Sequence, residues 1–436
     1  MARVCIDGFN ISLTTGSGIA TYARNLVRAL DGLGHETQLL FSSTRRPGKD
    51  DLLNEVALFD AGPAPRPPGL LDNITDWMGP LYVNGRAVPL SGRVEFRQFE
   101  NRVPSVDTLW ADRDVFHPAN RRFSKFRLFT PVTLGPRRAT DVMHWTCPLP
   151  MFETRAANIY TIHDMVPVRL PFATLDNKRT FLRLTRRLAR RADLIVTVSE
   201  ASRRDILELL PIDEDRVVNT YQSVEIPPSL LAASDEDIER QLASVFRLGF
   251  KDYFLFFGVM EPKKNLPRIV EAYLASGAKA PLVIVSATGW ARGDDMDNFL
   301  EDVLEPPKPG ERPRWPRRKV LRYNYLPFRM LLTLIRGARA TLFPSLYEGF
   351  GLPVLESMLL GTPVLTSGAG SLPEVAGDAA LVVDAYDAGA IRDGIRALDQ
   401  DEDLRNDLIA RGRLRVAEFT MEKYQQRLAA AYAKVA

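Results

Sequence analysis

Two carboxylates eight residues apart, Glu348 and Glu356, flank a glycine-bearing turn that could bind a phosphorylated ligand. The turn, Gly349-Phe350-Gly351-Leu352, follows a short apolar run at 340–343 and precedes a helical segment that starts at Pro353. At such a helix N-terminus, free backbone N–H groups and the helix dipole favour an anion. Because a carboxylate would repel that anion, the glutamates are better explained as acceptors for hydroxyl groups. An anion surrounded by hydroxyl groups is a sugar nucleotide.

Each glutamate also has a simpler explanation when it is considered alone. Glu356 is expected in the first turn of the helix, where it would complement the dipole, and Glu348 would be a solvated turn residue. The complete string EGFGLP at 348–353, with the second glutamate at 356, resembles the Glu-seven-residues-Glu signature of the fourth (group 1) family of retaining glycosyltransferases. The resemblance implies that Glu348 contacts the donor sugar, that the amides of 349–352 meet the sugar and diphosphate, and that Glu356 binds the ribose.

The same resemblance implies an α/β protein of the GT-B fold, in which two Rossmann-like domains with parallel sheets face each other across a cleft. The alternation of apolar strands and helices along the chain is typical of parallel sheets. We expect an N-terminal acceptor-side domain at 1–226, with an irregular acceptor region at about 60–140, and a nucleotide-sugar-binding domain at 227–418. A helix at 419–436 is expected to cross back onto the first domain.

A second string, GVMEPKKN at 258–265, follows an apolar segment at 253–257 and could also bind phosphate. A lysine between the end of a strand and a helix suits neutralisation of a phosphate, although two solvated turn lysines are the common alternative. The string resembles the family's phosphate-binding motif, which implies that Lys264 meets the donor diphosphate and that Lys263 assists. Val259 stands where many family members have arginine, so the usual pair of cations is not implied.

The first glycine loop gives a weaker signal. Gly16-Ser17-Gly18 opens a helix after the apolar strand at 4–7, but the third glycine of a dinucleotide fingerprint is missing and no lysine follows. A dinucleotide site and a Walker A loop are therefore both disfavoured, and a tight turn is the ordinary explanation. In the resembled family the loop after the first strand faces the donor diphosphate, which makes Gly16 and Gly18 candidates.

Two further candidates follow apolar strands of the first half. His163 comes directly after the strand at 158–162, where open α/β sheets place site residues, although a structural bond to Asp164 is equally consistent. The string IHDMVP resembles the family's first-domain histidine motif, in which the histidine touches the sugar near the reacting carbon. Ser199, after the strand at 192–198, resembles the family's serine near the donor cleft. His144 is a second acceptor-side candidate, with a structural role as the alternative.

The segment Lys178–Arg191 predicts a helix with apolar residues on one side and arginines on the other. It is either a core-packed helix with a solvated face or a peripheral contact with anionic membrane, which would suit a lipid-linked acceptor.

Asp112-Arg113-Asp114 resembles a metal-binding Asp-x-Asp motif, but we expect a solvated loop there and no metal site. Local spacing also predicts that Asn265 caps a helix and that Ser371 to Glu374 forms a capping box.

Composition excludes several other classes of protein. The net charge of only +3 gives no support for nucleic-acid binding, and two cysteines cannot form a disulfide scaffold. The start of the chain lacks a signal-like apolar region and no run of about 18 apolar residues occurs, so we expect a cytoplasmic protein, with contact at the inner face of the cell membrane as a further interpretation.

The favoured function is retaining, metal-independent transfer of a hexose from a nucleoside diphosphate sugar to a glycan or lipid-linked glycan in surface polysaccharide synthesis, such as that of lipopolysaccharide. Strings around His163 and Lys264 are similar to those of bacterial mannosyltransferases, which favours GDP-mannose and leaves UDP-sugars open. No other cofactor is expected. The alternatives are a nucleotide-sugar epimerase of the same architecture and a non-catalytic glycan-binding scaffold.

Overall fold

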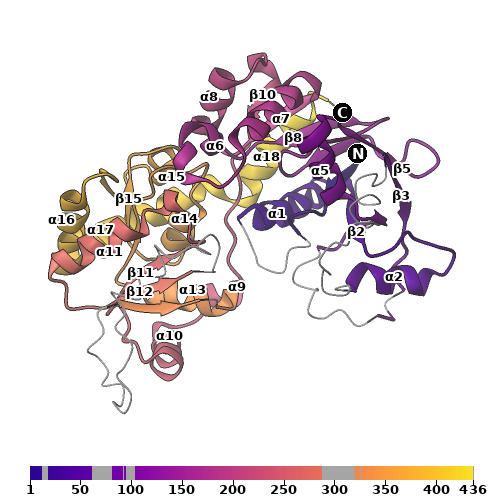
Figure 1. The fold of residues 1–436 in the computed structure, drawn as a ribbon. Helices are drawn as coiled ribbons and strands as arrows, with labels where there is room; N and C mark the ends of the chain where they lie inside the picture. Colours follow the sequence, from indigo (N-terminus) through magenta and orange to yellow (C-terminus); the bar gives the residue numbers. More distant parts are fainter. Residues whose placement is uncertain are drawn as a thin grey trace, which may run out of the picture.

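The computed structural model describes residues 1–11, 18–60, 81–91, 93–94, 104–286, 320–324 and 326–435. Figure 1 shows two lobes, each built on a β-sheet with helices on its faces. We call the elements from β1 to β10 together with the C-terminal helix α18 the first lobe, and those from α9 to α17 the second lobe.

The first lobe has a sheet of strand order β10-β9-β8-β6-β1-β2-β4-β3-β5-β7 in the described part of the chain. Its pairs are parallel except for β3 against β4. The strands are β1 (Arg3–Asp7), β2 (Glu36–Ser43), β3 (Val83–Ala87), β4 (Thr108–Arg113), β5 (Thr130–Leu134), β6 (Val142–Trp145), β7 (Met151–Glu153), β8 (Ala157–Thr161), β9 (Leu194–Thr197) and β10 (Val217–Asn219). The helices are α1 (Gly18–Gly32), α2 (Asp51–Phe59), α5 (Phe116–Phe126), α6 (Val166–Arg169), α7 (Lys178–Arg191) and α8 (Glu200–Leu209).

The second lobe has an all-parallel sheet of order β13-β12-β11-β14-β15-β16 among its described residues. Apolar β11 and β14 lie at its centre, as continuous hydrophobic runs do in parallel sheets covered on both faces. The strands are β11 (Phe254–Phe257), β12 (Leu282–Val285), β13 (Val320–Tyr323), β14 (Ala340–Phe343), β15 (Val364–Ser367) and β16 (Leu381–Val383). The helices are α9 (Pro228–Leu231), α10 (Asp235–Gln241), α11 (Leu266–Ser276), α13 (Phe328–Gly337), α14 (Leu352–Leu359), α15 (Leu372–Ala376), α16 (Ala388–Gln400) and α17 (Glu402–Arg415).

The C-terminal helix α18 (Met421–Tyr432) returns to the first lobe and packs on α1, as predicted (Figure 1). The hydroxyl of Tyr432 lies 2.6 Å from Nδ1 of His144, whose Nε2 lies 2.8 Å from the hydroxyl of Thr161. Burial lowers the pKa of His144 to about 3. His144 is therefore a neutral core residue that anchors α18. Of its two predicted roles the structural one is confirmed and the acceptor-side one is not, because both ring nitrogens are engaged in the interior.

Apolar side chains from both lobes form one continuous core. Phe350 of the second lobe packs against Phe419 and Tyr221, with ring centroids 5.6 and 6.5 Å apart. The same core includes Val354 of α14 and Leu26 of α1. Burial of this shared surface holds the carboxyl ends of the two sheets against each other.

The structure corrects two expectations in the first lobe. Asp112 is a strand residue with 3% exposure, and its carboxylate accepts the backbone N–H of Asn84 at 2.9 Å. The expected solvated loop was wrong because β4 continues through Arg113 beside β2. The region 60–140, expected to be irregular, contains β3, β4, α5 and β5 in its described parts.

Local spacing also misplaced two caps in the second lobe. The hydroxyl of Ser371 donates to the carbonyls of Glu348 and Phe350 instead of capping α15, so the predicted capping box is absent. Asn265 stands at the start of α11, but its amide donates to the carbonyls of Pro344 and Ala385. The Oδ1 of Asn265 accepts from the guanidinium of Arg268 at 2.6 Å instead of from a helix N–H, and the hydroxyl of Ser371 bonds to carbonyls of the preceding glycine turn.

Candidate active site

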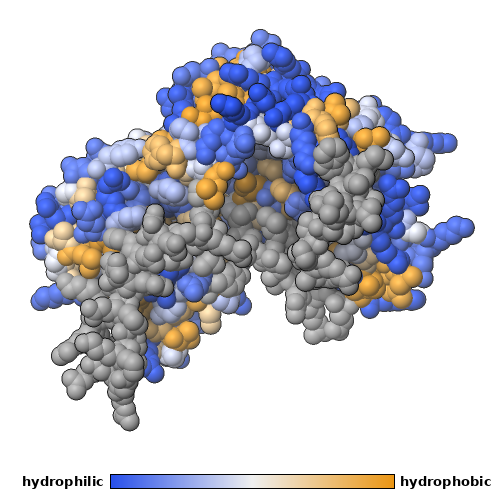
Figure 2. Space-filling view, in the orientation of Figure 1, coloured by the Kyte–Doolittle hydropathy of each residue, from blue (hydrophilic) through white to orange (hydrophobic). Residues whose placement is uncertain are grey.

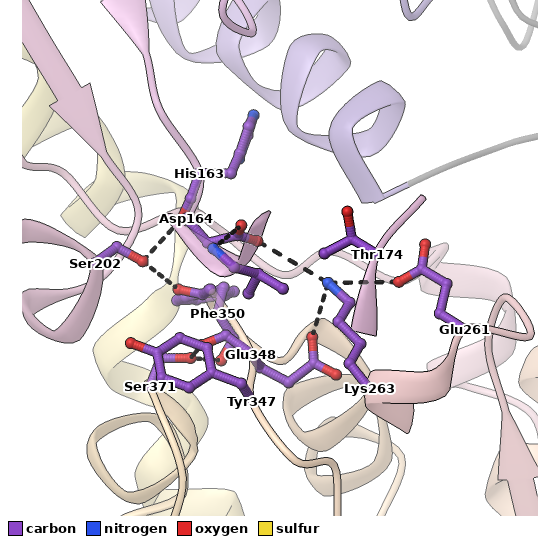
Figure 3. Close-up of polar contacts among 12 residues, drawn as sticks. His163, Asp164, Thr174, Ser202, Glu261, Lys263, Tyr347, Glu348, Phe350 and Ser371 are labelled. Atoms are coloured by element: carbon purple, nitrogen blue, oxygen red, sulfur yellow. Dashed lines mark hydrogen bonds and ion pairs between the residues drawn. The ribbon is translucent and has the colours of Figure 1, made fainter. Parts of the chain in front are cut away.

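Four sheet strands deliver polar side chains to the junction between the lobes. His163 follows β8 and Ser202 lies in the first turn of α8 after β9, both in the first lobe. Lys263 and Lys264 lie in a short 3-10 turn after β11, and Glu348 follows β14. Figure 3 shows His163, Ser202, Lys263 and Glu348 with polar contacts in this region. Carboxyl ends of parallel strands are where open α/β sheets bind ligands.

Glu348 forms a close, buried ion pair with Lys264 at this junction. The carboxylate is 5% exposed, and its Oε1 lies 2.7 Å from Nζ of Lys264. Burial raises the pKa of Glu348, but the charges of Lys264 and Lys263 outweigh burial and hold it below its usual value. The ammonium of Lys264 also lies 4.7 Å from the ring centroid of Phe343. Glu348 is therefore an ionised group that fixes the position of Lys264.

Lys263 has a different environment from Lys264, because three carboxylates surround it (Figure 3). Its Nζ lies 3.5 Å from Glu261, 4.0 Å from Glu348 and 4.0 Å from Asp164 of the first lobe. Burial lowers the pKa of Lys263, but these three carboxylates together raise it well above its usual range. Lys263 is thus a charged link between the lobes. Lys264 pairs with one carboxylate, so fewer negative groups compete with a ligand phosphate for its ammonium group.

His163 is held in one tautomer by the backbone. Its Nε2 lies 2.8 Å from the carbonyl oxygen of Thr146, and since a carbonyl only accepts, Nε2 carries the proton. Burial lowers the pKa of His163, which favours the neutral ring and leaves Nδ1 as an acceptor. The ring of Tyr22 meets the imidazole edge-on at a centroid distance of 4.8 Å.

A serine that the sequence did not indicate contacts both lobes. The hydroxyl of Ser202 lies 2.8 Å from the carbonyl oxygen of His163 and 3.2 Å from that of Gly349. The predicted Ser199 is buried, and its hydroxyl caps α8 by accepting the N–H of Ser202 at 3.0 Å. Ser199 therefore positions the helix, and Ser202 makes the contact. Its only sequence signal is its place one turn after a predicted cap.

Two helix N-termini converge beside these side chains. Gly351 begins α14 with a φ of 102°, a left-handed conformation that glycine adopts without strain. A Cβ at Gly18, the first residue of α1, would lie 3.9 Å from the Leu352 side chain. Both positive dipole ends thus face one region. The Phe350 side chain is buried between the lobes, so only its backbone N–H can face a ligand, and Gly16 lies outside the described residues.

Glu356 is the fifth residue of α14, so the expectation that it occupies the first turn was wrong. The helix begins at Leu352 because Pro353 is accommodated as its second residue. Burial raises the pKa of Glu356 to about 7. Within the described part of the chain, its carboxylate has no hydrogen-bond or ion-pair partner. An unpaired carboxyl group at partial burial can accept hydroxyl groups of a ligand.

Two family models match this chain. Residues 17–220 match the Glycosyl transferase 4-like domain, and residues 316–415 match Glycosyl transferases group 1. The chain belongs to the group 1 glycosyltransferases. The family resemblance stated from the Glu348 and Lys264 strings is therefore confirmed, and the family is one of retaining, metal-independent hexosyltransferases.

Among curated relatives, O-antigen chain mannosyltransferase B of Escherichia coli is 36% identical over 242 residues, which are 53% of this chain and 58% of the relative. The chain thus matches little more than half the length of that relative. Sucrose-phosphate synthase from Thermosynechococcus elongatus has a TM-score of 0.67 at 15% identity, covering 100% of this chain and 99% of that one. Anabaena HepE in complex with UDP and glucose has a TM-score of 0.65 at 14% identity, covering 99% and 100%. These likenesses confirm the GT-B fold.

The site of this group 1 glycosyltransferase thus brings together five of the predicted residues: His163, Lys263, Lys264, Glu348 and Gly349. Lys263 and Lys264 both pair with Glu348. His163 and Gly349 are joined through the hydroxyl of Ser202. Among the residues that the structure describes, no group of three or more His, Cys, Asp or Glu side chains could hold a metal ion. In the same residues, no helix is long and apolar enough to cross a membrane.

Proposed function

We propose that this group 1 glycosyltransferase transfers a hexose, with retention of configuration, from a nucleoside diphosphate sugar to a glycan. The observation that carries the proposal is the Lys264–Glu348 pair, 2.7 Å long, beside the converging N-termini of α1 and α14. A leaving diphosphate develops negative charge as the glycosidic bond breaks. A preorganised ammonium group and helix N-termini stabilise that charge.

Each side chain has a distinct role in the proposed reaction. Lys264 neutralises the diphosphate, and Glu348 orients Lys264 while it accepts a hydroxyl of the donor sugar. Lys263 links the lobes by its contact with Asp164. The backbone N–H groups of 349–352 and Gly18 line the diphosphate position, while Gly16 and Ser199 remain predicted contacts of the donor loop and cleft.

Neutral His163 and Glu356 act on hydroxyl groups. Nδ1 of His163, left as an acceptor by the bond from Nε2 to Thr146, orients the sugar near its reacting carbon. The carboxyl group of Glu356 accepts the ribose hydroxyls. The bond from the anomeric carbon to the diphosphate oxygen breaks, the acceptor oxygen attacks on the same face, and the diphosphate takes the acceptor proton. Closure of the lobes keeps water from the donor.

The donor that best fits is GDP-mannose. Support comes from the mannosyltransferase name of the 36% identical Escherichia coli relative. The Anabaena structure with UDP and glucose shares only the fold, so a UDP-sugar is the second candidate. We propose that residues 1–226 form the acceptor side, that 227–418 bind the donor and that 419–436 tie the two together. The acceptor would be a lipid-linked glycan of a surface polysaccharide, used on the cytoplasmic side of the membrane.

A thermal-shift screen against GDP, UDP and their sugar conjugates tests this proposal. A ligand at about 100 times its Kd stabilises the protein by about 2.7 kcal/mol. GDP-mannose should raise Tm most, and Lys264→Ala and Glu356→Ala should reduce the rise to about half or less, while Lys279→Ala, on the exposed surface of the second lobe, should keep it. No shift with any nucleotide would favour the scaffold alternative. Conversion of the donor sugar in the absence of any acceptor would favour the epimerase.

A further inference from the structure

A surface hollow of about 300 Å³ on the first lobe is lined entirely by arginines. Arg183, Arg186, Arg187 and Arg190 come from one stripe of α7, and Arg127 comes from the end of α5. The spacing of three, four and seven residues places the α7 side chains on one helix face. The buried face of the helix carries Leu184, Thr185, Leu188 and Ala189, so core packing and the arginine stripe are separated as predicted.

The structure holds these cations together without compensating carboxylates. Arg187 donates to the backbone carbonyl of Arg127, and its guanidinium lies 5.9 Å from the ring centroid of Phe123. Within the described residues, the side chains of Arg183, Arg186 and Arg190 form no hydrogen bond or ion pair. The neighbouring positive charges repel one another until an anion binds. Guanidinium groups recognise phosphate through paired N–H donors.

The dimensions of the stripe favour a surface over a single small anion. The α7 arginines span seven residues, which corresponds to about 10 Å along the helix axis. Leu128, directly after Arg127, is 56% exposed, and Leu175, shortly before α7, is 74% exposed. In Figure 2 the part of the first lobe that carries α7 and α8 is mostly hydrophilic, with smaller hydrophobic areas beside it. Arginines beside exposed apolar side chains are typical of a surface that lies in a lipid interface.

We propose that the arginine hollow of Arg127, Arg183, Arg186, Arg187 and Arg190 binds phosphate groups of anionic lipid headgroups and lays α7 along the membrane. The inference rests on the proposed function only for its purpose, which is to bring the cleft to a lipid-linked acceptor. Binding itself requires no donor. The residues that line the hollow include neither Lys264 nor Glu348, so the two surfaces are separate.

Vesicle sedimentation tests the proposal. The protein should sediment with vesicles that contain phosphatidylcholine and phosphatidylglycerol in equal amounts, but not with phosphatidylcholine alone, and added salt should release it. The triple variant Arg183→Ala, Arg186→Ala, Arg190→Ala should bind about 100-fold more weakly, since each basic residue near an anionic surface contributes about 1 kcal/mol, or a factor of about 5. Lysine at the same three positions should retain most of the binding.

The matched control is Arg137→Ala, Lys279→Ala, Arg413→Ala, which removes the same charge from exposed positions elsewhere. Equal loss of vesicle binding in both triples, or equal binding to both vesicle types, would overturn the proposal. The proposal would also be overturned if inorganic pyrophosphate raises the Tm of the Lys264→Ala variant while the protein does not bind vesicles. The α7 triple should keep its thermal shift with GDP-mannose, and Lys264→Ala should keep vesicle binding, so failure of either proposal is separable from failure of the other.

Discussion

Glu374 of the second lobe caps helix α8 of the first lobe, accepting the backbone N–H of Ala201 at 3.0 Å. Its other carboxylate oxygen accepts the N–H of Glu200 at 2.7 Å. These N–H groups at the start of α8 have no partner within their own helix. The first turn of α8 carries Ser202, which contacts His163 and Gly349. The contact between the lobes and the position of Ser202 in the site therefore both depend on the N-terminus of α8.

Replacing Glu374 by alanine should remove this cap. We expect a loss of about 1 kcal/mol in the free energy of unfolding, as for other N-caps. The KM for the donor should rise more than kcat falls, because the lobes close less firmly. Chemical denaturation and steady-state kinetics measure the two effects. Glu402→Ala, at an exposed position in the first turn of α17, is the control, and equal effects of both variants would contradict the cross-lobe role.

The cap by Glu374 shows where prediction from sequence ends. Strands, helices and the glycine turn around Gly351 have local patterns, and they were predicted within a few residues. The spacing from Ser371 to Glu374 also matches a local capping box, but Glu374 bonds to a residue 173 positions away. A contact between segments so far apart has no signature in spacing. The same reason explains why Ser202 was missed.

Replacing Lys264 by alanine should weaken donor binding by 10- to 100-fold, because a buried charge-assisted contact with the diphosphate contributes about 1.5 to 3 kcal/mol. It should also destabilise the free protein, since Glu348 would keep a buried negative charge with its nearest cation removed. Titration calorimetry with the donor nucleotide and denaturation without it measure the two effects. If affinity is unchanged while stability falls, Lys264 serves only to pair with Glu348.

The lysine string also separates what resemblance provides from what geometry adds. The motif implied that Lys263 and Lys264 both serve the phosphate. Only the folded chain brings Asp164 within 4.0 Å of Lys263 and so distinguishes a link between lobes from a ligand-binding cation. Asp164 comes from the other half of the chain, and its approach depends on how the lobes close.

Gly349 should not tolerate a side chain. A Cβ there would lie 2.7 Å from the carbonyl oxygen of His163 and 2.9 Å from the Cβ of Asp164. Both obstacles are backbone or short side-chain atoms, so Gly349→Ala should force the lobes apart and cost about 1 to 3 kcal/mol in stability. Transfer activity should fall at least as far as donor affinity, as measured by kinetics and calorimetry. Gly48→Ala, which meets nothing within 4 Å, is the control, and wild-type activity in Gly349→Ala would contradict the close approach.

Glu356→Gln should separate stability from donor binding. Burial raises the folded-state pKa of Glu356 from its ordinary 4.5 to about 7, so the folded chain holds a proton that the unfolded chain releases between these values. Stability must then fall as pH rises through that window, and it stays lower above pH 7. Glutamine carries no charge and avoids this cost. The Tm of Glu356→Gln relative to the wild type should therefore increase from pH 5 to pH 7 and remain higher at pH 8.

Donor affinity of Glu356→Gln should nevertheless fall 10-fold or more at pH 8, because a charge-assisted bond to the ribose hydroxyls is lost. Thermal melts across pH and calorimetry at pH 8 measure the two effects, and a Tm difference that does not vary with pH would show that Glu356 is not the group that titrates.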